Sequence, residues 1–223
     1  MKTLDIYYVR HGEPDYSSDT LTELGHKQAE KTAQVLKKIE FDKVFSSSLG
    51  RAVETAKHTT EKTGNKIFQI DWIREDLAWK HLAFNNEENF CTWIYNQEKY
   101  MGRMFELQDD PDWYLNTLFP GEIRVGIKEM AEAVDEWLLE MNIFHDRETK
   151  KFISRGKTPQ TIAVFAHEGA STLFISSILD MSYAKYLTHH FPAELASITH
   201  IRLYLDDVKG AMLISYNQTS HLK

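Results

Sequence analysis

Cysteine and long apolar segments are nearly absent from this sequence. Cys91 is the one cysteine among 223 residues, so an internal disulfide is excluded. No apolar run approaches the roughly 20 residues that a membrane-spanning helix needs. The apolar start at 4–9 is interrupted by Asp5 and is too short for the hydrophobic region of a signal peptide. We therefore expect a cytoplasmic protein that has no membrane partner.

Positive charge is also in short supply. The 26 Lys and Arg residues are outnumbered by 33 Asp and Glu residues, which leaves a net charge of −7. This balance argues against a broad nucleic-acid surface, so no nucleic acid is expected as a partner. Any affinity for an anionic ligand must therefore come from a local pocket. Repeats are lacking as well, and nothing in the sequence indicates an oligomeric state.

What the sequence does contain is an alternation of short apolar runs and amphipathic segments. The order predicts an α/β fold, a three-layer sandwich with a mostly parallel central sheet flanked by helices. The last two strands form a hairpin, which we expect to place an antiparallel strand at one edge of the sheet. We expect strands at 4–10, 43–46, 66–70, 161–166, 197–205 and 211–216, and helices at 22–39, 49–63 and 169–181.

The pattern changes between about 78 and 150. Helices are expected at 86–107 and 125–144, and the segment 145–160 is polar enough to be a surface loop. The region is rich in aromatic residues, most of which we assign to ordinary core packing. We interpret it as a helical insertion that caps the functional site, within a single domain over residues 1–223.

Polar side chains follow three of the predicted strands. Arg10 and His11 end the first strand, Arg51 opens the helix after the second, and His167 and Glu168 follow 161–166. Ligands of open α/β sheets bind beyond the carboxyl ends of the strands. Arginine offers a fork of donors for phosphate oxygens, and neutral histidine can accept a phosphoryl group. Taken alone, Arg10 and His11 could equally be polar residues at a strand end.

The ordered motifs resemble those of the histidine phosphatase superfamily, in its phosphoglycerate mutase-like branch. The resemblance implies that His11 is the nucleophile, that Arg10, Arg51 and His167 bind phosphate, and that no cofactor or metal takes part. It also implies a small phosphorylated metabolite as the partner. The motifs are Arg10-His11-Gly12, the segment 21–29 (LTELGHKQA), the segment 47–56 (SSLGRAVETA) and Ala166-His167-Glu168-Gly169.

The general acid is expected by resemblance at Glu75, which follows the third strand. Ala78 stands where the family has a glycine, so the local loop departs from the pattern. Glu168 is an alternative acid, because it directly follows the second pocket histidine. Asp76 and Glu13 are further alternatives.

Two enzymatic functions and one binding function fit this resemblance. Glycolytic mutases carry an arginine directly after the acid and an Arg-Arg pair in the insertion, whereas here Asp76 follows Glu75 and no Arg-Arg pair occurs. This difference favours a metal-independent phosphatase that hydrolyses a small phosphomonoester through a phosphohistidine intermediate. The alternatives are mutase-type phosphoryl transfer and a catalytically weak member that binds a phosphorylated ligand or a protein.

Overall fold

The computed structural model describes the chain except for residues 86–90, 94–97, 111, 117–118, 120–121 and 190–191. Its main element is an 8-stranded sheet in the order β5-β4-β10-β1-β11-β9-β8, with β12 paired to β11. The strands are β1 (Lys2–Arg10), β4 (Lys43–Ser47), β5 (Ile67–Ile70), β8 (Ile143–Asp146), β9 (Lys151–Ser154), β10 (Thr161–Ala166), β11 (Ile198–Leu205) and β12 (Ala211–Gln218).

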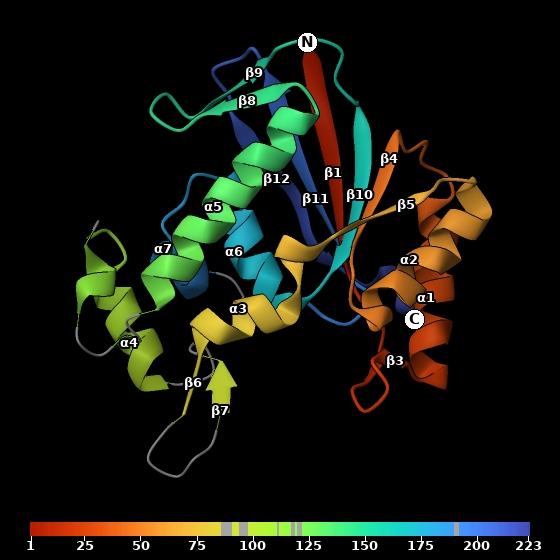
Figure 1. Ribbon diagram of the computed structural model, residues 1–223, viewed down its shortest axis with the longest axis horizontal. Helices are drawn as coiled ribbons and strands as arrows, with labels where there is room; N and C mark the ends of the chain where they lie inside the picture. The colour runs from red at the N-terminus through yellow and green to blue at the C-terminus, as the bar shows by residue number, and fades with distance from the viewer. Residues whose placement is uncertain (86–90, 94–97, 111, 117–118, 120–121, 190–191) are drawn as a thin grey trace.

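The sheet is parallel where it carries the polar strand ends. β10 pairs in parallel with β1 and with β4, and β4 pairs in parallel with β5. Helices cover both faces, α1 and α2 on one side and α5 and α6 on the other (Figure 1). The predicted α/β sandwich with a mostly parallel sheet is therefore confirmed. These helices are α1 (Glu23–Leu36), α2 (Gly50–Thr63), α5 (Ile123–Glu140) and α6 (Glu168–Ile178).

The alternating direction of side chains along the central strands explains why the core has two layers, one on each face of the sheet. Ile6 and Tyr8 on β1 pack into the larger cluster beneath α5 and α6. Val9, their neighbour in β1, instead joins a smaller cluster that includes Leu36 of α1 and Ala56 of α2. Because successive side chains of a strand point to opposite faces, a strand buried on both faces is a continuous apolar run.

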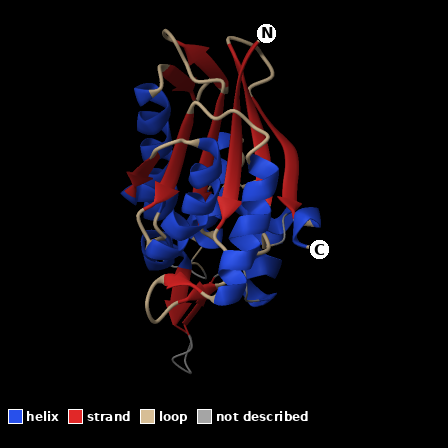
Figure 2. Cartoon of the chain, turned by 90° about the vertical axis from the view of Figure 1, so that its right-hand side faces the viewer, coloured by secondary structure: helices blue, strands red, loops and turns tan. Residues whose placement is uncertain are grey.

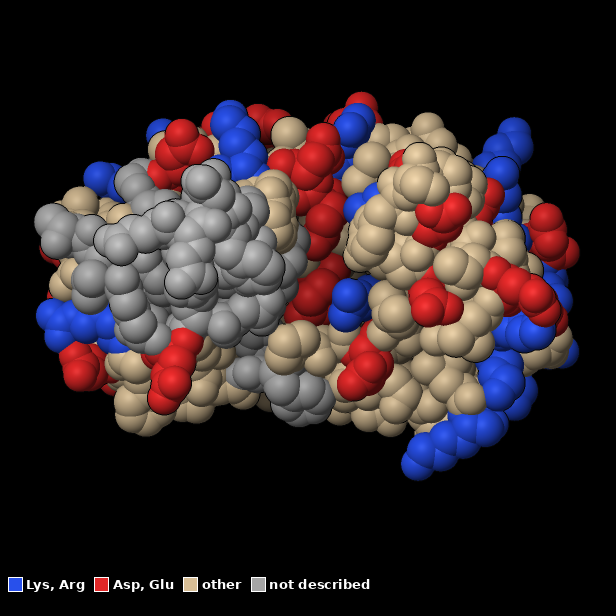
Figure 3. All heavy atoms as spheres, turned by 90° about the horizontal axis from the view of Figure 1, so that it is seen from below, with Lys and Arg blue, Asp and Glu red and all other residues tan. Residues whose placement is uncertain are grey.

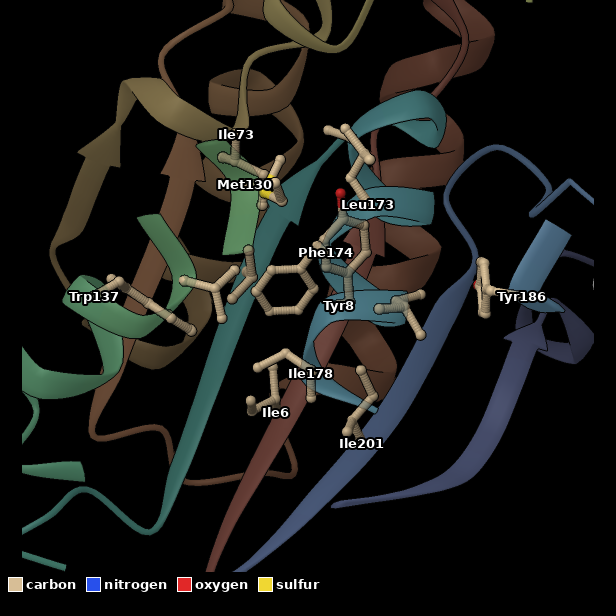
Figure 4. Close-up of a cluster of buried hydrophobic side chains, with 14 of the residues drawn as sticks. Ile6, Tyr8, Ile73, Met130, Trp137, Leu173, Phe174, Ile178, Tyr186 and Ile201 are labelled. Carbon is tan, nitrogen blue, oxygen red and sulfur yellow. The ribbon is translucent and has the colours of Figure 1, made fainter. Parts of the chain in front are cut away.

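The larger cluster is built around aromatic rings. Phe174 of α6 lies between Tyr8 and Trp137, as Figure 4 shows. Its ring centroid is 5.4 Å from that of Tyr8 and 5.9 Å from that of Trp137. Burial of such rings is a large stabilising contribution, and the contacts fix α5 and α6 against the sheet.

One prediction about the sheet was wrong. The segment 145–160 is not a plain surface loop, because β8 and β9 form an antiparallel hairpin that extends the main sheet beside β11. The final hairpin, in contrast, supplies the antiparallel edge strand that was expected, because β12 pairs only with β11 among the described strands. β11 pairs antiparallel with β1 and is an interior strand.

The insertion also differs from its prediction. The expected helix 86–107 is shorter, because β7 (Cys91–Trp93) pairs with β6 (Ala83–Asn85) and α4 (Glu98–Leu107) begins only afterwards. The rest of that expected helix, 86–90 and 94–97, falls outside the described residues. The expected helix 125–144 is α5, which ends earlier because β8 follows. Two helices were not predicted, α3 (Glu75–Leu82) and α7 (Tyr183–His189).

The small β6–β7 ribbon lies at the end of the molecule opposite the N-terminus (Figure 2). Trp113 and Phe119 of the insertion are buried and belong to the larger core cluster, as expected for most of its aromatics. In the described part of the chain, no helix has the length and apolar character needed to cross a membrane.

Candidate active site

Three strand ends converge on one cavity. β1 ends at Arg10, β4 leads into α2, and β10 leads into α6. The cavity has a volume of about 560 Å³. Figure 3 views the molecule from this end and shows a groove along which acidic side chains gather. The described residues that line the cavity are Arg10, His11, Tyr16, Leu49, Arg51, Glu75, Asp76, Trp79, Glu168 and Pro192.

His11 is held in one tautomer by its chain neighbour. Its Nδ1 lies 2.7 Å from the carbonyl oxygen of Gly12. A carbonyl only accepts, so Nδ1 carries the proton and Nε2 keeps its lone pair. Burial, together with the charges of Arg10 and Arg51, lowers the pKa of His11 to about 3 despite the Gly12 hydrogen bond. The imidazole is therefore a neutral nucleophile at pH 7.

Gly12 is required by a close approach of two backbone segments. A Cβ atom at this position would lie 2.5 Å from the carbonyl oxygen of Gly25. Its backbone N–H donates to Thr55 Oγ1 at 3.1 Å, which ties the turn to α2. The turn that orients His11 is thus fixed from two sides.

Arg51 lies in the first turn of α2 and is oriented by Asp19. Arg51 Nη1 donates to Asp19 Oδ1 at 2.5 Å, and the N–H of Gly50 donates to Oδ2 at 2.6 Å. The Asp19 carboxylate thus occupies the helix N-terminus, a position that favours anions. Arg51 Nε is buried and has no hydrogen-bond partner within the described structure.

Arg10 is the second guanidinium that lines the cavity. Its Nη1 donates to the carbonyl oxygen of Ala193 and lies 4.0 Å from Glu168 Oε2. Its Nε is buried and lacks a partner in the described part of the chain. Each of the two cavity guanidiniums therefore holds donor capacity that a bound oxyanion would fill.

His167 lies behind His11 and is not among the residues that line the cavity. Its ring centroid is 5.2 Å from that of His11, and its Nε2 lies 2.8 Å from Ser47 Oγ. The other ring nitrogen, Nδ1, is buried without a partner among the described residues. Burial and the neighbouring charges lower the pKa of His167 well below its usual value, so this ring is neutral as well.

Glu75 reaches the cavity from the start of α3. Its Oε1 accepts from the N–H of Gly169 at 3.0 Å, and its Oε2 lies 3.5 Å from the N–H of Ala170. The carboxylate therefore caps the N-terminus of α6. Burial raises the pKa of Glu75 above its usual value, although these hydrogen bonds favour the ionised form.

Glu168 lines the same cavity from α6. Its Oε2 accepts from the N–H of Ala193 at 3.1 Å. Burial raises the pKa of Glu168 to about 7, against the opposing charge of Arg10. The two carboxyl groups are coupled, because each negative charge disfavours ionisation of the other.

The remaining acidic alternatives are placed less favourably. Asp76 lines the cavity, but its carboxylate is bound by Arg74 at 3.0 and 2.9 Å. These hydrogen bonds lower the pKa of Asp76, so it is a poor proton donor at neutral pH. Glu13 is absent from the described lining, and its Oε2 instead accepts from Thr22 Oγ1 at 2.9 Å.

Sequence reasoning missed several residues of the cavity. Tyr16 lines the cavity and Asp19 binds Arg51, and both lie in the short hairpin of β2 (Pro14–Asp15) and β3 (Thr20–Leu21), which no sequence pattern linked to Arg51. Trp79 lies one helical turn after Glu75, so a helix prediction for this segment would have placed it on the same face. Leu49 and Pro192 complete the missed residues.

His26, His58 and His145 are not among the described residues that line this cavity. His26 and His58 meet on the surface of α1 and α2, with Nδ1 and Nε2 3.1 Å apart. His145 is buried between Asp135 and Asp180, at 2.9 Å from each. Within the described ranges, no group of three or more His, Cys, Asp or Glu residues could hold a metal ion.

The arrangement combines a neutral nucleophilic nitrogen, two guanidiniums and two carboxyl groups of raised pKa. Guanidiniums stabilise the charge that develops on the equatorial oxygens of a phosphoryl group. A carboxyl group of raised pKa can give a proton to a leaving oxygen. The set is suited to moving a phosphoryl group from an ester oxygen to nitrogen.

Comparisons with known proteins show which families this chain resembles. Residues 6–99 match the model of the histidine phosphatase superfamily (branch 1). Adenosylcobalamin/alpha-ribazole phosphatase from Salmonella typhi is 23% identical over 207 residues, 85% of each chain. A probable phosphoglycerate mutase from Photorhabdus laumondii is 28% identical over 112 residues, 46% of this chain and 50% of its own length.

A similar fold occurs in solved structures. Mycobacterial glucosyl-3-phosphoglycerate phosphatase superposes with a TM-score of 0.63 at 20% identity, covering 98% of this chain and 100% of its own. That likeness extends the shared fold beyond residue 99, through the strand and helix that carry His167. The chain is thus similar to the histidine phosphatase superfamily over residues 6–99, and over nearly its whole length it shares the fold of these solved structures.

Proposed function

We propose that the protein is a metal-independent phosphatase that hydrolyses a small phosphomonoester through a phosphohistidine intermediate on His11. The observation that carries the proposal is the His11–Gly12 hydrogen bond, which leaves a neutral Nε2 in a cavity lined by Arg10 and Arg51. Phosphatases among the relatives support the same reaction class.

In the first step Nε2 of His11 attacks phosphorus, and the bond between phosphorus and the ester oxygen breaks. Arg10 and Arg51 bind the equatorial oxygens, where charge is spread in the transition state. The phosphoryl group on His11 also offers an acceptor for Nδ1 of His167, which has no other partner among the described residues. Protonated Glu75 gives its proton to the leaving alkoxide, and the alcohol departs.

In the second step water hydrolyses the intermediate. Ionised Glu75 accepts a proton from the water, whose oxygen attacks phosphorus as the N–P bond breaks. Inorganic phosphate leaves, His11 returns to its neutral form, and Glu75 is again protonated. One carboxyl group thus acts first as acid and then as base.

Glu75 is the acid we favour, and Glu168 remains the alternative. Both line the cavity, and burial raises the pKa of both. The Oε2 of Glu168 is already engaged by the N–H of Ala193 and faces Arg10, which binds phosphate in this mechanism. Glu75 comes from α3, and within the described structure its carboxylate accepts from the backbone N–H groups of Gly169 and Ala170 and forms no ion pair with a guanidinium.

The direct test is phosphate release from p-nitrophenyl phosphate in the presence of a metal chelator. We expect turnover by the wild type and a loss of at least about 10³-fold in His11→Ala. An acid-labile phosphoryl label should form on the wild type and be missing from His11→Ala. The surface variant His58→Ala is the matched control and should keep both signals. Near-normal turnover by His11→Ala would refute the mechanism.

A mutase is the second candidate, because a probable phosphoglycerate mutase is among the relatives. A mutase must hold a substrate with two anionic groups, yet Arg10 and Arg51 are the only cations in the described lining. A mutase would interconvert phosphoglycerates when primed with 2,3-bisphosphoglycerate, whereas the phosphatase should release phosphate without the primer. A protein that only binds phosphorylated ligands would do neither.

A further inference from the structure

Trp79 and Glu75 line the cavity from the same face of α3. They are four residues apart, so they are neighbours on the helix surface, separated by about 6 Å along the axis. If Glu75 protonates the leaving oxygen, the next atoms of the leaving group lie where Trp79 stands. The indole therefore forms the wall of the leaving-group side of the cavity.

Several other described residues of the lining are apolar or aromatic. Tyr16 has its ring centroid 5.4 Å from the guanidinium carbon of Arg51, which places it at the rim. Leu49 and Pro192 line the cavity together with Tyr16 and Trp79. A flat ring entering beside the phosphate would contact these surfaces, and stacked or edge-on ring pairs are favourable beyond their area alone.

Charge limits the leaving group in a second way. The cations of the described lining, Arg10 and Arg51, each already lie near a carboxylate, that of Glu168 and that of Asp19 respectively. Asp76 adds a further carboxylate at the rim, and Arg74 offsets part of its charge. A second anionic group on the substrate would therefore meet acidic side chains without a described cation to bind it.

We propose that Trp79 selects the substrate and that the preferred substrate is a phosphomonoester of an uncharged alcohol bearing an aromatic ring. The proposal rests on the phosphatase function proposed above. It assigns to Trp79 the contact with the leaving group, while the phosphate is bound by the guanidiniums and His11.

The test compares 2-phenylethyl phosphate with propyl phosphate and with 3-phosphonooxypropanoate. All three are esters of primary alcohols, so they differ mainly in the ring or carboxylate that the leaving group carries. We expect kcat/KM for 2-phenylethyl phosphate to exceed that for propyl phosphate by about tenfold or more. The carboxylate analogue should be slower than propyl phosphate by about fivefold or more.

Variants at one helix position then locate the preference. Trp79→Leu keeps an apolar side chain and should bring the phenylethyl-to-propyl ratio to within about threefold of unity, because the ring contact is lost. Trp79→Phe keeps a ring and should restore most of the ratio. Leu77→Ala is the matched control, because Leu77 is exposed on the same helix and lies outside the described lining. Circular dichroism checks that each variant is folded.

The outcomes separate this proposal from the one on which it rests. If the wild type hydrolyses none of the three esters nor p-nitrophenyl phosphate, the phosphatase function fails and this proposal fails with it. Hydrolysis with equal kcat/KM for the phenylethyl and propyl esters overturns the substrate preference alone. An unchanged ratio in folded Trp79→Leu overturns the role of Trp79, and rapid hydrolysis of the carboxylate analogue overturns the charge argument.

Discussion

Each functional group in the cavity depends on one neighbour that fixes its state. The Gly12 carbonyl fixes the tautomer of His11, and the Asp19 carboxylate fixes the orientation of Arg51. The orientation of Arg51 lowers its affinity for phosphate, because Asp19 neutralises part of the charge that Arg51 would offer to a phosphate. Single residues therefore set a balance between orientation and charge.

The first prediction concerns this balance at Arg51. In Asp19→Asn the single amide oxygen can still accept from Arg51, but the hydrogen bond from the Gly50 N–H and the negative charge are lost. We expect inorganic phosphate to inhibit the variant about fivefold more tightly, because the guanidinium now faces the phosphate with its full charge. Inhibition constants measured against p-nitrophenyl phosphate check this.

Asp15→Asn is the control, since Asp15 lies in the same hairpin but binds Ser17 and Ser18 instead. An unchanged inhibition constant in Asp19→Asn would mean that Asp19 moves away from Arg51 when phosphate binds.

The second prediction distinguishes Glu75 from Glu168 as the acid. Glu75→Gln should lower kcat/KM for an alkyl phosphate by about 10²-fold or more and for p-nitrophenyl phosphate by about tenfold or less. The reason is that nitrophenolate departs with little protonation, whereas an alkoxide needs the proton.

Glu168→Gln should slow both substrates by a similar factor. Should the leaving-group dependence appear in Glu168→Gln instead, the proton comes from the carboxyl group next to the second histidine.

Sequence patterns predicted some of these residues and missed others. Arg10, His11 and Arg51 follow apolar runs that end abruptly, so their meeting at one sheet edge was predictable. Asp19 was not, because nothing in a polar hairpin indicates that its carboxylate crosses to another helix. Trp79 was not predicted as a cavity residue because α3 is only an 8-residue helix that directly follows a short 3-10 turn.

At the scale of secondary structure elements, local pattern sufficed to predict the strands of the parallel part of the sheet. β1 and β10 are near-continuous apolar runs and were predicted nearly to their observed ends. β8 and β9 are 4-residue strands with polar residues, and their place in the sheet depends on pairing with each other and with β11. Pairing between strands that are far apart in the sequence is hard to predict from the few residues of each strand.

A partly buried charge network holds the β8–β9 hairpin to the helices. His145 of β8 lies between Asp135 of α5 and Asp180, which follows α6. Arg147 donates to Asp135 Oδ2 through Nε at 2.9 Å and to Ser177 Oγ through Nη2 at 2.8 Å. The network thus joins the β8–β9 hairpin to both helices of this face.

The third prediction concerns the charge of His145. Burial lowers its pKa, but the hydrogen bonds to Asp135 and Asp180 outweigh this effect, so the net pKa is raised above 6.5. Its contribution to stability is therefore complete below the unfolded-state pKa of about 6.5 and is lost as the pH rises through the folded-state pKa.

Urea unfolding should show His145→Gln to be less stable than wild type by about 3 kcal/mol at pH 6, with a smaller difference at pH 9. The exposed variant His189→Gln is the control and should show no such trend. A difference for His145→Gln that is equal at the two pH values would mean that the folded-state ring is neutral throughout.

At the scale of the whole molecule, the cavity is where stability is given up for function. His11 and His167 are buried neutral, and Glu168 is buried with its ionised form disfavoured. The lowered histidine pKa values reduce stability as the pH falls below about 6.5, because the unfolded state binds more protons there. The raised pKa of Glu168 has the opposite effect, because it reduces stability as the pH rises. The groups of this one site therefore reduce stability at both low and high pH.

The last prediction isolates the carboxyl part of this cost. The pKa of Glu168 is about 7 in the folded state and 4.5 in its ordinary state, so the folded protein binds more protons between these values. The contribution of Glu168 to the free energy of unfolding is therefore most favourable below pH 4.5. It falls as the pH rises from 4.5 through 7. Glu168→Gln removes the ionisation and keeps an acceptor for the N–H of Ala193. We expect it to raise the free energy of unfolding by up to roughly 3 kcal/mol at pH 8 and by almost nothing at pH 4.5.

Urea titrations of wild type and variant at the two pH values measure the difference, with exposed Glu61→Gln on α2 as the control. A stabilisation of equal size at both pH values would show that the gain comes from packing rather than from the buried charge. A loss of stability at pH 8 would show that the ionised carboxylate is bound favourably by Arg10, and the carboxyl group would then be no proton donor at neutral pH.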